Sequence, residues 1–94
     1  MKICNKIKVE DCFDGSSVFE YFFNSAWSKN EIYSLECMGH LEYFPEFPRP
    51  FFRVIQKGGL QIKGVEGDTK CRVILPKKNR EKTEILLENT FSNI

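Results

Sequence analysis

A chain of 94 residues has room for one domain, and its composition (41% hydrophobic, 29% charged) is typical of a soluble globular protein and excludes a disordered chain. The net charge of +1 argues against a dedicated nucleic-acid binder, which is usually far more basic. No apolar run approaches the ~18–20 residues of a membrane span, and the N-terminal residues alternate where a signal peptide would be continuous. We therefore expect a single domain over residues 1–94, located in the cytoplasm, where thiols stay reduced.

Residues 2–9 alternate between apolar and polar side chains. This pattern predicts a half-buried strand at a sheet edge, with Ile3, Ile7 and Val9 on one face together with Asn5. A turn is predicted at residues 14–15. The next residues, Ser-Val-Phe-Glu, have the spacing of a capping box, in which a hydroxyl and a carboxylate satisfy free N–H groups at the start of a helix. The sequence therefore predicts a helix over residues 17–27.

A second strand is predicted over residues 33–44. The segment 45–50 contains three prolines, which cannot donate to a ladder, and we interpret it as a connection to three further strands. Those strands lie within residues 51–75, where Val, Ile and Phe favour strands. Residues 58–59 and 67–68 each contain glycine and are predicted to form two-residue turns between them.

The faces of these three strands follow from the turns. With two-residue loops, Ile55, Ile62 and Val73 line up on one face, which is apolar enough to be buried. Phe52 and Val54 fall on the opposite face, which mixes apolar and polar side chains. This alternation predicts an antiparallel sheet packed on one side only.

A second helix is predicted over roughly residues 79–91, where Leu87 and Phe91 recur at helical spacing. The predicted element order is β-α-β-β-β-β-α. The fold class that follows is α+β, a two-layer sandwich of a mostly antiparallel sheet with two helices on one face. The other sheet face is partly open and is expected to carry Met38, His40, Gln61, Lys63 and Arg72.

The chain contains four cysteines and one histidine, without the paired spacing of a zinc signature. Cys37 and His40 are close in sequence, but they point to opposite faces of the predicted strand. We interpret the cysteines as buried, reduced thiols, and predict no cofactor, no metal site and no catalytic residues. No glycine-rich phosphate loop or nucleophile elbow is present. A thiol or metal site that uses cysteine and His40 is a remaining alternative.

The second half of the chain is basic and the first half is acidic. Residues 51–94 hold nine Lys and Arg against five Asp and Glu, whereas residues 1–50 hold five against eight. A basic surface beside exposed aromatic rings can seat a single-stranded nucleic acid. This alternative function would use Lys63, Lys70, Arg72, Lys77, Lys78, Arg80 and Lys82.

The main hypothesis places the contact surface on the aromatic and proline-rich segment before the three strands. Aromatic and Arg side chains dominate the binding energy of protein interfaces, and exposed clusters of them mark contact sites. We therefore expect a small non-catalytic, cytoplasmic module that binds another protein through this segment and the open sheet face. A homodimer is also left open, as is an enzyme whose active site is completed by a partner chain. The predicted partner-binding residues are Phe44, Phe47, Arg49, Phe51, Phe52 and Arg53.

Overall fold

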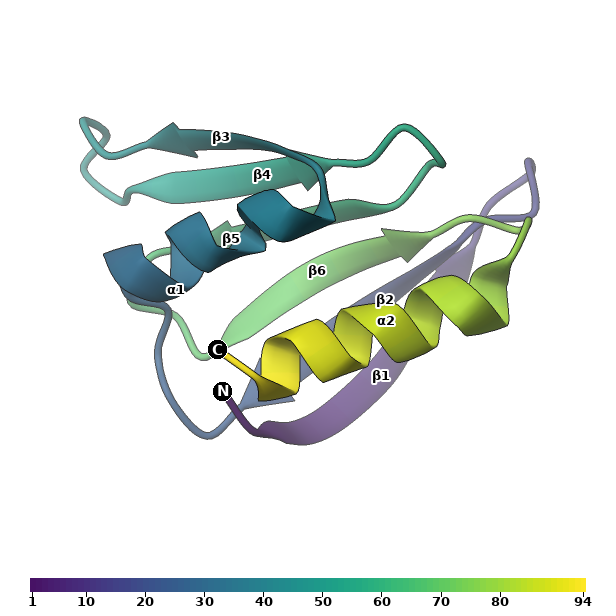
Figure 1. Ribbon diagram of the computed structural model, residues 1–94, viewed down its shortest axis with the longest axis horizontal. Helices are drawn as coiled ribbons and strands as arrows, with labels where there is room; N and C mark the ends of the chain where they lie inside the picture. The colour runs from purple at the N-terminus through teal and green to yellow at the C-terminus, as the bar shows by residue number, and fades with distance from the viewer.

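The computed structural model describes all 94 residues and consists of one sheet whose helices lie together on one of its faces (Figure 1). The elements in chain order are β1 (Ile3–Asp11), β2 (Ser17–Phe23), α1 (Lys29–Ser34), the 3-10 helix η1 (Leu35–Met38), β3 (His40–Phe44), β4 (Phe51–Ile55), β5 (Gln61–Val65), β6 (Lys70–Leu75) and α2 (Arg80–Ser92). The six strands pair antiparallel in the order β1-β2-β6-β5-β4-β3. The predicted α+β class, with two helices over one face of an antiparallel sheet, is confirmed. Neither helix is long and apolar enough to cross a membrane.

The segment that was expected to form the first helix is the strand β2, so the predicted element order is wrong at this point. Its Ser17 hydroxyl does not cap a helix but donates to Asp11 of β1 at 2.6 Å. Aromatic residues dominate β2 and favour a strand, in which Tyr21 is fully buried. The capping box of this region lies further along, where Ser28 and Glu31 cap the short helix α1. The first two strands are therefore antiparallel neighbours joined by a hairpin, and the first helix follows the second strand.

Only the second half of the predicted strand 33–44 is a strand. The residues before it form α1 and η1, and they bury Ile32, Leu35 and Met38 against the sheet. These buried residues are three positions apart, which is a helical spacing. The same stretch also alternates in a way that fits a strand, so the sequence alone did not distinguish the two. Met38 is only 3% exposed, so its predicted place on the open face is wrong.

β1 is an edge strand, as predicted, and the predicted apolar face is correct for Ile3, which packs against the core, but wrong for Ile7 and Val9. A register shift between Ile3 and Asn5, and another near the end of the strand, interrupt its pairing with β2. Such bulges redirect the side chains that follow them. Lys6 consequently faces α2, whereas Ile7 and Val9 are 47% and 43% exposed.

The predicted register is correct for one of the two hairpins in residues 51–75. β5 and β6 pair as expected, with Gly64 opposite Cys71. β4 and β5 are shifted by one residue, so that Val54 and not Ile55 lies opposite Ile62. A shift of one residue moves every side chain of a strand to the other face of the sheet.

The loop between β4 and β5 explains this shift. The Gln56 N–H donates to the Leu60 carbonyl at 2.9 Å, which leaves three residues in the loop instead of two. Gly59 takes a positive φ of 107°, as three-residue hairpin loops require. As a result Phe52 is fully buried and Ile55 is 38% exposed, the reverse of the prediction.

The predicted C-terminal helix is confirmed as α2, and an ionic cluster fixes it against β1 and β2. Lys6 contacts Glu84 and, at 3.0 Å, Glu88, and the Tyr21 hydroxyl donates to Glu88 at 2.8 Å. Burial lowers the pKa of Lys6, but hydrogen bonds and charges of the two glutamates outweigh it, so that the pKa is raised overall. Beneath this cluster Phe91 is fully buried in the core.

Gly64 is a position where the packing leaves no room for a side chain. A Cβ added there would lie 2.5 Å from Cζ of the buried Phe52 ring. We expect Gly64→Ala to lower the free energy of unfolding by about 1–3 kcal/mol, because the ring has no free space to move into. Gly58→Ala is the matched control, since the nearest atom to its Cβ would be 3.5 Å away. Urea unfolding measures both, and equal effects would contradict the packing described here.

The hairpin of β1 and β2 should be sensitive to acid. Hydrogen bonds from Lys8 and then Ser17 lower the pKa of Asp11 below its usual 3.8. A lowered pKa stabilises the fold above about pH 4, and this contribution is lost as the pH falls and the carboxylate is protonated. The difference in unfolding free energy between wild type and Asp11→Asn should therefore be positive at pH 7 and vanish toward pH 2. Glu10→Gln is the matched control, because it removes the same charge from a neighbouring residue that forms no ion pair.

Candidate functional site

The sheet face opposite the helices carries a row of charged side chains, one from each of five neighbouring strands. The strand registers place Glu42 of β3, Arg53 of β4, Lys63 of β5, Arg72 of β6 and Glu20 of β2 opposite one another. We call these five residues the charged row. Neighbouring strands lie ~4.8 Å apart, so the three cations in the middle span roughly 10 Å.

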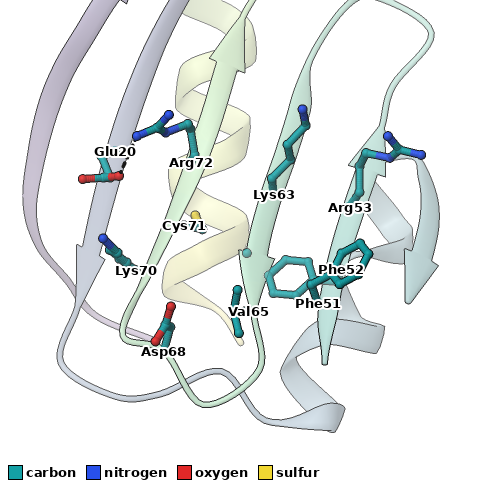
Figure 2. Close-up of a pocket in the computed structure, with 11 residues that line it drawn as sticks. Glu20, Phe51, Phe52, Arg53, Lys63, Val65, Asp68, Lys70, Cys71 and Arg72 are labelled. Atoms are coloured by element: carbon teal, nitrogen blue, oxygen red, sulfur yellow. Dashed lines mark hydrogen bonds and ion pairs between the residues drawn. The ribbon is translucent and has the colours of Figure 1, made fainter. Parts of the chain in front are cut away.

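The two ends of the charged row are ion-paired and its centre is not. Arg53 Nε donates to Glu42 at 2.7 Å. At the other end Arg72 donates to Glu20 at 3.2 Å, and Figure 2 shows this second contact. Lys63 stands between the two arginines and forms no ion pair. The centre of the row is therefore a cationic position without an anionic partner.

A groove of about 460 Å³ lies along the charged row (Figure 2). The helices lie behind the sheet in this view, so the groove opens on the uncovered face. Lys70, which lies on the same side of β6 as Arg72, is a second cation in the groove without an ion pair. The exposed and half-buried side chains that line the groove include Arg53, Lys63, Lys70 and Arg72, the carboxylates of Glu20 and Asp68, and the apolar Phe51 and Val65.

Three phenylalanines form an apolar cluster beside the groove, and we call Phe44, Phe47 and Phe51 the aromatic patch. The rings of Phe44 and Phe51 stack with their centroids 4.7 Å apart, and Phe47 packs against Phe51 at 5.2 Å. Phe47 is 48% and Phe51 37% exposed. Since Phe51 also lines the groove, the patch and the groove form one continuous surface.

The structure brings most of the predicted partner-binding residues together. Phe44, Phe47 and Phe51 form the aromatic patch, and Arg53 lies next to it in the groove. Arg49 reaches the other end of the groove, where it pairs with Asp68 at 3.3 Å. Phe52 does not belong to the surface, because the register shift of β4 buries its ring in the core.

The predicted nucleic-acid surface is divided between two places. Lys63, Lys70 and Arg72 line the groove. The other four basic residues lie in the loop and first turn that lead to α2, on the helix-covered side (Figure 1). Among them, Arg80 is used structurally, since its guanidinium donates to the Gly15 carbonyl at 2.6 Å. The other three are Lys77, Lys78 and Lys82.

The cysteines and the histidine do not come together. Cys71 is buried, and burial raises the pKa of its thiol, as expected of an inert core cysteine. Cys4 and Cys37 are exposed and Cys12 is half-buried, so the prediction of buried thiols is wrong for these three. His40 is exposed at the start of β3. No three His, Cys, Asp or Glu side chains lie close enough together to hold a metal ion.

Two acidic members of the site, Glu20 and Asp68, were not identified from the sequence. Glu20 lies in the segment that was interpreted as a helix, so its position beside Arg72 was out of reach. Asp68 was assigned only to a turn. Side-chain alternation along β3 places Glu42 on the opposite face from Tyr43, and this was the one sequence signal that Glu42 faces the open side.

The groove offers guanidinium and ammonium donors, two carboxylates and an aromatic wall, which suit noncovalent binding of a polar ligand with an apolar part. Comparisons with protein-family models, with curated proteins and with solved structures find no match to this chain.

The contrast between adjacent phenylalanines gives a direct test of which face is open. Phe52→Ala should lower the free energy of unfolding by about 3–5 kcal/mol, because it leaves a cavity in the core. Phe51→Ala should lower it by only about 1 kcal/mol, because its ring is partly exposed. Denaturant unfolding of the two variants measures the difference. A larger loss for Phe51→Ala would show that the register of β4 is the one first predicted.

Proposed function

We propose that the protein is a non-catalytic binding module that contacts a partner protein through the aromatic patch and the adjoining groove. The observation that carries the proposal is the aromatic patch itself, in which Phe47 and Phe51 expose 48% and 37% of their surface. Exposed aromatic rings beside arginines have the composition of energetic hot spots in protein interfaces. Removing these rings from water on binding supplies the driving force for association.

The rigidity of the patch supports this proposal. Phe44 and Phe51 lie on paired strands, directly opposite each other. The segment 45–50, with three prolines, holds Phe47 against them, and the Pro50 carbonyl accepts a hydrogen bond from the Glu66 N–H at 2.8 Å. Side chains that are already ordered lose little conformational entropy when they bind. A partner can therefore bind without first ordering this surface.

A single-stranded nucleic acid is the second candidate, because Lys63, Lys70 and Phe51 share one groove. Three observations make it weaker. The Phe51 ring already stacks on Phe44, the net charge is only +1, and the basic residues near α2 are separated from the groove. We therefore retain a protein as the proposed partner.

The proposed setting is the cytoplasm, and the four free cysteines are consistent with a reducing compartment. A second copy of the chain is among the partners that the proposal admits. A homodimer formed by the aromatic patch would be self-complementary, with the same residues on both subunits.

The proposal is tested by capture from native lysate with the tagged protein, at low and high salt, with protein and nucleic acid both analysed. We expect a protein partner that survives high salt, because apolar contacts are not screened. Phe47→Ala should reduce its capture at least tenfold while the thermal midpoint stays nearly unchanged. Phe13→Ala is the matched control, since Phe13 is a fully exposed phenylalanine of the β1–β2 turn, outside the patch.

Two results would contradict the proposal. Equal capture by wild type and Phe47→Ala would remove the aromatic patch from the interface. Recovery of nucleic acid that salt releases, and that the double variant Lys77→Glu/Lys78→Glu loses, would favour the basic surface instead.

A further inference from the structure

We propose that the charged row binds an acidic segment of the partner protein, with Lys63 at the centre of the contact. This inference rests on the proposed function and adds the chemistry of the partner. The aromatic patch supplies the apolar part of the interface, and the row selects a segment with carboxylate side chains beside that part.

The three cations of the charged row are arranged unfavourably in the protein alone. Lys63 lies directly opposite Arg53 on one side and directly opposite Arg72 on the other. Like charges at opposite positions of neighbouring strands destabilise a sheet. The two glutamates of the row lie at its outer ends and pair with the arginines, which leaves Lys63 without compensation. An anion over Lys63 would remove this repulsion.

Both arginines of the charged row keep free N–H donors. Both contacts of Arg53 go to one oxygen of Glu42, at 2.7 Å from Nε and 2.5 Å from one Nη. Arg72 reaches Glu20 through a single Nη. A guanidinium carries five N–H donors, so each arginine keeps donors for a bound carboxylate. Their side chains are 42% and 52% exposed, which makes these donors accessible.

The size of the cationic region fits a short acidic segment better than a nucleic-acid backbone. The three cations span roughly 10 Å, whereas carboxylates on alternate residues of an extended peptide lie roughly 6.6–6.8 Å apart. Two such carboxylates can therefore bind between three cations. A longer phosphate chain would meet Glu20 and Asp68, which lie in the same groove.

Apolar side chains lie on both sides of the charged row, and they determine which residues of the bound segment accompany its carboxylates. Phe51 and Val65 lie opposite each other on one side of the row, and Ile55 lies on the other side, 38% exposed. Because alternate side chains of an extended peptide point to opposite sides, a segment that lies edge-on along the row can direct acidic side chains to the cations and the intervening apolar side chains to one flank.

The test uses Lys63→Glu, which creates a row of alternating charges, Glu-Arg-Glu-Arg-Glu. In the empty protein this variant should raise the thermal midpoint by about 2–6 °C at low salt, because two repulsive pairs become attractive. The probe is a fluorescein-labelled ten-residue peptide that contains four glutamates and two leucines, followed by fluorescence anisotropy. Its affinity should fall at least tenfold in Lys63→Glu, and by a smaller factor in Lys63→Gln. Lys57→Glu is the control, because it makes the same charge change in the exposed β4–β5 loop and should leave affinity within about twofold.

Several outcomes overturn the inference. One is that the peptide does not bind wild type at 1 mM, and another is that it binds Lys63→Glu and Lys57→Glu with equal affinity. A third is that the thermal midpoint of Lys63→Glu is lower than that of wild type. Tighter binding of a ten-nucleotide oligothymidine than of the peptide would assign the row to nucleic acid. If the peptide fails while Phe47→Ala still abolishes partner capture, the acidic segment alone is wrong and the binding module stands. If Phe47→Ala also has no effect, both proposals fail.

Discussion

The structure depends on Trp27, which is 1% exposed in the connection between β2 and α1. Its indole N–H donates to the Lys70 carbonyl at 3.1 Å, and its backbone N–H donates to the Asp68 carbonyl at 2.9 Å. Its own carbonyl accepts from the Gly67 N–H, also at 2.9 Å. These three bonds hold the β5–β6 turn, and with it the Asp68 end of the groove, against the connection to the helices.

The Trp27 ring also joins the two layers. It packs edge-on against Phe52 of β4 at 4.9 Å and Phe91 of α2 at 6.0 Å. Phe52 is fixed in turn over Gly64, where a Cβ would not fit. Because side chains alternate along a strand, a buried Phe52 requires that Phe51 and Arg53 face the open side. The core packing on one face thus determines the position of the aromatic patch and the charged row on the other.

Some elements could be predicted because their local sequence pattern fits only one kind of structure. The edge strand β1, the proline segment 45–50, the β5–β6 hairpin and α2 each follow from alternation, proline, a glycine turn or helical spacing. β2 was missed because its Ser-Val-Phe-Glu start fits a helix cap as well as a strand. The short α1 was missed because it has the capping box but too few residues to establish a helical period.

The site could be predicted only in part, for the same reasons. The aromatic patch was found from composition, since exposed phenylalanines cluster in one short segment. The charged row depends on strand order and register, because Glu20 and Arg72 are distant in sequence and adjacent only when β2 pairs with β6. The position of Phe52 depended on one extra loop residue, which the sequence of two adjacent glycines does not specify.

The central claim is that the open face of the sheet is the contact surface. The most direct measurement is an amide chemical-shift map of the ¹⁵N-labelled protein, titrated with the glutamate- and leucine-containing peptide. The account predicts shifts that centre on β4, β5 and β6, strongest at Phe51 and Lys63, while α2 stays unchanged. Shifts that centre on α2, where Ile85 and Leu86 are also exposed, would contradict it.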